Sequence, residues 1–236
     1  MDEAGLPILA IQRLRMTTDG TGVTTLICSM GCPLRCRLCI NPASWDKTVP
    51  GEILSVDELY ERVKIDNLYF LTTNGGLTFG GGEPLLHSVF LKSFMEKYRE
   101  TNWLFNLESS LNVSRKNLDD VIPYIHDFII DTKDFNEERY KAYTGGEYGI
   151  FFENLMYLKE KVGPDRILLR IPVIPFLHKG NEAEENRAEF EKLGFTRFDV
   201  FPYVNPENRK PISEKAKENR EILLKPAKEE LAKEES

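Results

Sequence analysis

Short apolar runs alternate with amphipathic stretches along this chain of 236 residues. The apolar runs, rich in β-branched and aromatic residues, predict six strands at residues 23–29, 76–80, 103–109, 127–132, 166–173 and 198–202. The amphipathic stretches predict helices at residues 56–64, 88–99, 115–122, 137–143, 151–161 and 182–193. Strands that alternate with helices form βα units, so we expect an α/β fold with a mainly parallel sheet.

The number of βα units narrows this expectation. Six units are too few to close an eight-stranded barrel, and we therefore expect an open (βα)6 partial barrel. Ser55-Val-Asp-Glu58 is a capping box and marks the start of the first predicted helix. We expect residues 1–212 to form one domain and the charged residues 213–236 to form a helical tail that Pro226 interrupts.

Polar motifs follow the predicted strands at the points where they end. Chemistry in barrels of this kind lies on the loops at the carboxyl ends of the strands, so these motifs are expected to share one site. In chain order they are a cysteine-rich loop at residues 30–41, Gly80-Gly-Gly-Glu-Pro84, Glu108-Ser-Ser110 and Asp131-Thr-Lys133. Arg170 lies on the fifth predicted strand itself.

The cysteine-rich loop has the spacing Cys32-x3-Cys36-x2-Cys39. Thiolates are soft ligands that suit zinc and iron-sulfur clusters alike, and Cys28 could complete a compact four-thiolate zinc site. Cys28 lies in an apolar run, however, where a small buried side chain is the usual role of cysteine. Disulfides are the weakest interpretation, because we identify no secretory segment. The spacing alone leaves the cluster and the zinc site open.

Composition limits the classes of partner. Hydrophobic residues make up 41% of the chain and charged residues 29%, as in ordinary globular proteins. The net charge of -7 argues against a nucleic-acid partner, which usually meets a basic surface. No apolar run approaches the roughly 20 residues of a spanning helix. We expect no membrane association and a cytoplasmic location.

The cysteine loop and the later glycine-rich motif together resemble the radical S-adenosylmethionine (SAM) superfamily. In that superfamily three thiolates bind a [4Fe-4S] cluster, and the fourth iron binds SAM. The resemblance implies an enzyme that reductively cleaves SAM to a 5'-deoxyadenosyl radical, with Cys32, Cys36 and Cys39 as cluster ligands. It also implies the open partial barrel expected above.

Further segments resemble one branch of the superfamily, the glycyl radical enzyme activating enzymes typified by the pyruvate formate-lyase activating enzyme. They are Asp19-Gly-Thr-Gly22, Cys39-Ile-Asn-Pro42, Trp45-Asp46, Asp131-Thr-Lys133 and the surroundings of Arg170. The resemblance implies oxygen sensitivity, a partner glycyl radical enzyme or peptide substrate, and flavodoxin or ferredoxin as electron donor.

The same resemblance implies the residues that contact SAM. Leu38 stands where an aromatic residue often precedes the last cysteine, and it would pack on adenine. Glu108 and Asp131 are also the implied ligands of a monovalent cation, sodium or potassium. The complete implied SAM-binding set is Leu38, Gly81, Gly82, Glu83, Glu108, Ser109, Asp131, Lys133 and Arg170.

Two alternatives remain open at this point. One is a radical SAM enzyme that modifies a peptide or a small molecule. The other is a structural zinc-binding module without catalysis. The three histidines, His87, His126 and His178, lie outside the motifs and are expected to be structural.

Overall fold

One mixed sheet forms the centre of the computed structural model, which describes residues 5–16, 18–174 and 177–203. The strand order is β3-β1-β2-β4-β5-β6-β7-β8. From β2 to β8 every neighbouring pair is parallel, whereas β1 is antiparallel to both β2 and β3. The strands are β1 Leu6–Met16, β2 Val23–Ser29, β3 Glu52–Leu54, β4 Gly76–Gly81, β5 Leu104–Ser109, β6 Asp127–Asp131, β7 Ile167–Val173 and β8 Arg197–Pro202.

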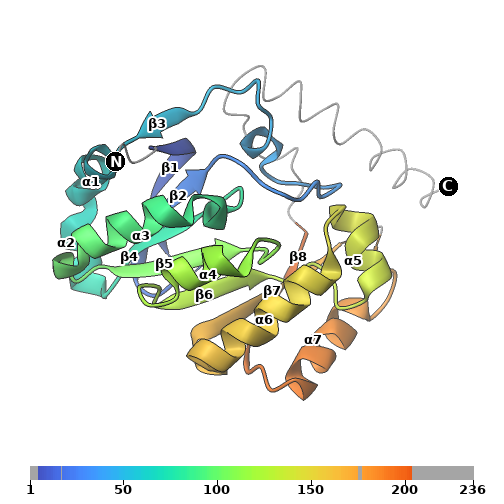
Figure 1. The fold of residues 1–236 in the computed structure, drawn as a ribbon. Helices are drawn as coiled ribbons and strands as arrows, with labels where there is room; N and C mark the ends of the chain where they lie inside the picture. Colours follow the sequence, from blue (N-terminus) through green and yellow to red (C-terminus); the bar gives the residue numbers. More distant parts are fainter. Residues whose placement is uncertain (1–4, 17, 175–176, 204–236) are drawn as a thin grey trace.

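Helices form an outer layer along one face of this curved sheet (Figure 1). Each βα connection returns the chain to the same side, as right-handed crossovers between parallel strands require. The helices are α1 Val56–Val63, α2 Asn67–Thr73, α3 Ser88–Lys97, α4 Arg115–Val121, α5 Glu137–Thr144, α6 Tyr148–Val162 and α7 Glu182–Lys192.

The predicted open, mainly parallel partial barrel is confirmed. Within the described ranges β3 and β8 are the two edges of the sheet. All six predicted strands are present, and each end lies within one residue of its predicted position. The capping box at Ser55 is also present, with the Ser55 and Glu58 side chains each accepting a hydrogen bond from the other residue's backbone N–H.

Three elements were not expected, namely β1, β3 and α2. The register of β1 against β2 shifts twice, between Ile8 and Ala10 and between Gln12 and Arg15. Leu14, inside the second shift, has a left-handed backbone with φ 54°. Such bulges break the alternation of apolar and polar positions that identifies a strand.

The two faces of the sheet carry different residue types, because successive side chains in a strand point to opposite sides. The face toward the helices is apolar: Phe79 on β4 lies edge-on to Phe94 of α3, with 5.9 Å between the ring centroids. On the inner face Glu108, Asp131 and Arg170 line a pocket instead. The sheet therefore separates the hydrophobic core from a polar cavity.

The predicted tail at residues 213–236 lies outside the described residues, so the predicted domain boundary stays a prediction. In the ranges that the structure describes, no helix combines the length and apolar character needed to cross a membrane.

Candidate functional site

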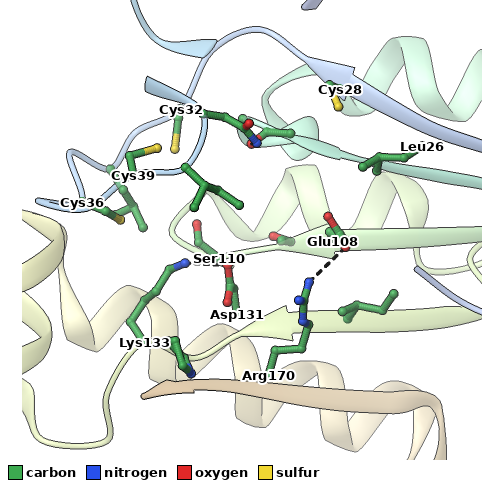
Figure 2. A pocket seen from close by; sticks show the side chains of 18 of the residues that line it. Leu26, Cys28, Cys32, Cys36, Cys39, Glu108, Ser110, Asp131, Lys133 and Arg170 are labelled. Atoms are coloured by element: carbon green, nitrogen blue, oxygen red, sulfur yellow. Dashed lines mark hydrogen bonds and ion pairs between the residues drawn. The ribbon is translucent and has the colours of Figure 1, made fainter. Parts of the chain in front are cut away.

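A single pocket at the carboxyl ends of the parallel strands brings the sequence motifs together (Figure 2). Its walls come from the loop after β2, the end of β4, and the ends of β5, β6 and β7. Eleven of the twelve predicted site residues line it, namely Cys32, Cys36, Leu38, Cys39, Gly81, Gly82, Glu108, Ser109, Asp131, Lys133 and Arg170. The exception is Glu83.

Backbone hydrogen bonds hold the cysteine loop against the end of α5. Arg35 N donates to Thr144 O at 2.8 Å, and Arg37 N donates to Tyr143 O at 2.9 Å. Within the loop, Cys39 N donates to Cys36 O at 3.1 Å. Two parts of the chain far apart in sequence thus fix the positions of the thiols.

All four cysteines are thiols, and three of them share one wall of the pocket. Figure 2 shows Cys28 apart from Cys32, Cys36 and Cys39, on strand β2. Among the described residues, no group of three or more His, Cys, Asp or Glu side chains converges to hold a single metal ion. Cys28 thus lies away from the other three cysteines, which a compact four-thiolate zinc site would have to include (Figure 2).

Three thiols match a [4Fe-4S] cluster in number and in donor type, because each thiolate of a cluster binds its own iron atom. Burial raises the pKa of the Cys32 and Cys36 thiols to about 12 and also raises the pKa of Cys39. Thiols in this environment stay protonated at neutral pH unless a cationic centre binds them. Iron supplies such a centre, and a coordinating thiol is deprotonated outright.

The glycine-rich loop passes very close to strand β2. Gly81 has φ 90°, and a Cβ added there would lie 2.6 Å from the Cα of Cys28. Glu83 N donates to Gly31 O at 2.7 Å, and the Asn41 side-chain amide donates to Gly81 O at 3.4 Å. Only glycine allows this approach, which places the loop backbone beside the cysteine loop.

Glu83 lies behind the pocket wall, and its side chain is fully buried. Its Oε2 accepts bonds from Ser110 N at 2.9 Å and Ser110 Oγ at 2.6 Å, while Oε1 accepts from Ser109 Oγ at 2.8 Å and Leu85 N at 3.3 Å. Burial raises the pKa of this carboxyl, and these hydrogen bonds oppose the rise. The structure therefore places Glu83 as a support that joins the β4 and β5 loops.

Glu108 and Arg170 form an ion pair across the inner face of β5, β6 and β7. Arg170 Nη1 lies 3.2 Å from Glu108 Oε1, and Arg170 Nε lies 3.4 Å from Asp199 Oδ2. The guanidinium also stands 4.7 Å from the centroid of the Phe201 ring. Burial raises the pKa of Glu108, and the charge of Arg170 opposes the rise. The guanidinium is thus fixed on the pocket wall.

Asp131 and Lys133 form a second ion pair nearer the cysteine loop, with Lys133 Nζ 2.5 Å from Asp131 Oδ2. Burial opposes the charged form of both groups, but their mutual attraction prevails, so the pKa of Asp131 is lowered and that of Lys133 is raised. The backbone of Lys133 is left-handed, with φ 63°. Residues other than glycine rarely adopt this conformation, and it often occurs at functional sites. Both carboxylates predicted to bind a monovalent cation, Glu108 and Asp131, therefore already have a protein cation as partner.

Leu38 is buried between the pocket and a small apolar cluster with Tyr143 and Ile174. This cluster connects the cysteine loop to α5 and to the segment after β7. Leu38 thus presents an apolar surface to the pocket, as its predicted contact with adenine requires.

Sequence reasoning assigned no role to Arg15 and Gln12, which also line the pocket. Arg15 forms an ion pair with the buried Asp19 and donates to Gln12 Oε1 at 3.0 Å. Both residues lie on β1, the strand that the apolar pattern did not show. The motif Asp19-Gly-Thr-Gly22 was the one feature of the sequence that could have indicated this part of the pocket, because Asp19 also lines it.

His178 is buried, and both of its ring nitrogens make hydrogen bonds. Its Nδ1 accepts from Ile174 N at 3.0 Å, so Nε2 carries the proton and donates to Asp134 Oδ2 at 3.0 Å. Arg139 Nε donates to the same carboxylate oxygen at 2.8 Å. This buried group joins the loop after β6 to the segment after β7.

The family comparison agrees with this geometry. Residues 26–185, more than half of the chain, match the family model described as the radical SAM superfamily. The chain belongs to the radical SAM superfamily. The matched range begins on β2 and contains every predicted site residue, and the family prediction is confirmed.

Two relatives in the radical SAM superfamily are activating enzymes, which confirms the predicted resemblance to that branch. The indoleacetate decarboxylase activating enzyme of Tractidigestivibacter scatoligenes is 32% identical over 157 residues, covering 66% of this chain and 49% of the relative. The (2S)-3-sulfopropanediol dehydratase activating enzyme of Klebsiella oxytoca is 29% identical over 243 residues, covering 78% of this chain and 76% of the relative. The chain thus spans about half of the first relative and about three-quarters of the second.

A solved structure of similar fold is Streptococcus suis SuiB bound to S-adenosylmethionine, with a TM-score of 0.57. The likeness covers 74% of this chain and 39% of SuiB at 13% identity. At this identity the likeness shows a shared radical SAM fold alone.

Proposed function

We propose that this chain binds a [4Fe-4S] cluster and SAM in the pocket at the carboxyl ends of the strands, and that it installs a glycyl radical on a partner enzyme. The main support for the proposal is that three cysteine thiols and two ion pairs, Asp131–Lys133 and Glu108–Arg170, line the same pocket. Neither the thiols nor the ion pairs alone would indicate this chemistry.

In this proposal Cys32, Cys36 and Cys39 hold the cluster. When bound and reduced, the cluster supplies the electron that cleaves SAM to methionine and a 5'-deoxyadenosyl radical. SAM carries one carboxylate, one ammonium and one sulfonium group, so its site needs charges of both signs. Lys133 and Arg170 supply cations for the carboxylate, and Asp131 and Glu108 supply anions for the positive groups.

Apolar side chains in the lining would help to exclude water when a ligand fills the pocket. Leu26, Leu38, Ile129 and Pro172 give it apolar walls between the charged pairs. Excluding water strengthens the electrostatic contacts to a bound ligand and protects a reactive radical from side reactions. Gly81 and Gly82 bring backbone polar groups to the same cavity without side chains that would fill it.

The partner is proposed from the relatives, which activate a decarboxylase and a dehydratase. We propose a glycyl radical enzyme as substrate, and flavodoxin or ferredoxin as the donor of the electron. Oxygen sensitivity and a cytoplasmic location follow as predictions from this chemistry. A monovalent cation beside SAM would require Glu108 or Asp131 to bind it in addition to its present partner.

The test is deuterium transfer from a labelled partner. Glycyl radical enzymes from the same genome are produced with [2-²H]glycine and mixed anaerobically with the reconstituted protein, dithionite and SAM. We expect deuterium in 5'-deoxyadenosine together with a glycyl radical signal in the electron paramagnetic resonance (EPR) spectrum, because one hydrogen atom moves from Cα to C5'. SAM cleavage with no deuterium transfer from any of these enzymes would contradict the proposed partner and favour a peptide or small-molecule substrate.

A further inference from the structure

Trp45 lies directly after the cysteine loop, at the end of the short 3-10 helix Pro42–Ser44. Its backbone N–H donates to Pro42 O at 3.4 Å, which anchors the residue. The indole Nε1 is buried and forms no hydrogen bond of ordinary length and angle with a described residue. Trp45 therefore presents a buried donor that lacks a well-formed hydrogen bond.

Such a donor needs an explanation. Leaving a buried N–H group unsatisfied costs about 1–3 kcal/mol, and most buried polar groups in folded proteins have partners. The indole N–H lies against the thiol of Cys39, the group with which it interacts. A neutral thiol is only a weak acceptor. A thiolate is a much better one, because hydrogen bonds to charged groups are roughly twice as strong as neutral ones.

The guanidinium of Arg35 stacks on the face of the Trp45 indole. The guanidinium carbon of Arg35 lies 4.7 Å from the centroid of the Trp45 ring. The same guanidinium donates through Nη1 to the carbonyl oxygens of Cys32 and Leu34, each at 2.7 Å. The indole is thus stacked against a cation that is itself bonded to the backbone of the cysteine loop, which ties the ring to that loop.

We propose that Trp45 Nε1–H donates a hydrogen bond to the Cys39 thiolate of the bound cluster and thereby raises the reduction potential of the cluster. Hydrogen bonds to the sulfurs are among the determinants of that potential. Reduction adds one negative charge, so the donor stabilises the reduced cluster more than the oxidised one. Trp45 is a positioning residue that acts through Cys39. The proposal rests on the cluster of the proposed function and is independent of the partner enzyme.

The chain offers a matched control, because it contains two tryptophans. The second, Trp103, donates through Nε1 to Asn67 Oδ1 at 2.7 Å, and neither residue lines the pocket. Trp45→Phe and Trp103→Phe each remove one indole N–H and keep an aromatic ring, but only the first removes it beside a cluster cysteine.

The experiment is a redox titration of the reconstituted cluster, followed by EPR, in the wild type and both variants. For Trp45→Phe we expect the ratio of reduced to oxidised cluster at a fixed potential to fall about tenfold, which for one electron corresponds to a midpoint about 59 mV more negative. Trp103→Phe is expected to keep the wild-type midpoint. Equal midpoints in all three proteins would overturn the inference alone, whereas a wild type that forms no cluster would overturn the proposed function as well.

A second measurement applies if Trp45→Phe does not retain the cluster. In Trp103→Phe labelled with ¹⁵N-tryptophan, Trp45 is the sole indole, and pulsed EPR of the reduced cluster reports its coupling to nearby nitrogen nuclei. We expect a ¹⁵N hyperfine coupling from the indole. A spectrum without that coupling would overturn the inference.

Discussion

The close approach of Gly81 to strand β2 leads to a quantitative prediction for Gly81→Ala. An added Cβ would lie 2.6 Å from the Cα and 2.7 Å from the Cβ of Cys28, at φ 90°. Both atoms belong to a central strand and cannot move aside as the end of a flexible side chain would. The substitution therefore combines a backbone conformation unfavourable for alanine with overpacking.

The magnitude follows from the two contributions. A left-handed conformation costs an L-residue roughly 1–2 kcal/mol, and overpacking a well-filled interior typically costs about 1–3 kcal/mol. We expect Gly81→Ala to lower the free energy of unfolding by about 2–5 kcal/mol. Gly145 provides the control, because it has a left-handed backbone with φ 65° and ψ 10°, and its added Cβ would meet only the Cβ of Arg35, at 4.0 Å. Gly145→Ala should show the conformational cost without overpacking.

The assay is urea unfolding of both variants and the wild type in the cluster-free, reduced form. Free energies are compared through the midpoint and slope of each transition. A loss for Gly81→Ala no larger than the loss for Gly145→Ala would refute the reasoning, because it would show that the glycine-rich loop does not press against β2.

Two further predictions concern buried carboxylates. Burial disfavours the charged form of Asp134, but hydrogen bonds from His178 and Arg139 prevail and lower its pKa. The carboxylate therefore stabilises the fold above its unfolded pKa of about 3.9, and this contribution is lost as the pH falls through the folded pKa. In urea unfolding between pH 3 and 7, the stability difference between wild type and Asp134→Asn should shrink below about pH 3.9; a constant difference would contradict the assignment. Glu83→Gln should lower the free energy of unfolding by about 1–3 kcal/mol, because the amide N–H groups of the new glutamine would face protein donors. The control is Glu58→Gln, which keeps a capping box and should change the free energy of unfolding by less than about 0.5 kcal/mol. Equal effects of these two substitutions would refute the supporting role of Glu83.

The positions of the site motifs were predictable because they depend on strand order and strand ends. Asp131 at the end of β6 pairs in register with Arg170 in the middle of β7, so both side chains reach the same region of the sheet. The apolar run before the cysteine loop identified β2 with its observed bounds, Val23–Ser29, because that strand is buried along almost its whole length. Short-range patterns were sufficient for these features.

Other features depend on contacts that no local pattern reveals. The contact of Glu83 with SAM stays a prediction, but the sequence did not reveal that two serines from the loop after β5 donate to its carboxylate. Strand β1 was missed because Leu14 interrupts the alternation, and with it the contribution of Arg15 to the pocket. Helix α2 was missed because it is short and only Phe70 is fully buried.

The central claim is that the three cysteines hold a cluster that cleaves SAM. The most direct test is the amount of 5'-deoxyadenosine formed from SAM by the anaerobically reconstituted, reduced protein. The control is a variant with Cys32→Ala, Cys36→Ala and Cys39→Ala, while Cys28→Ala tests the cysteine that stands apart. The account predicts product from the wild type and from Cys28→Ala, and none from the triple variant. A wild-type protein that forms no product, or product that persists without the three cysteines, would contradict it.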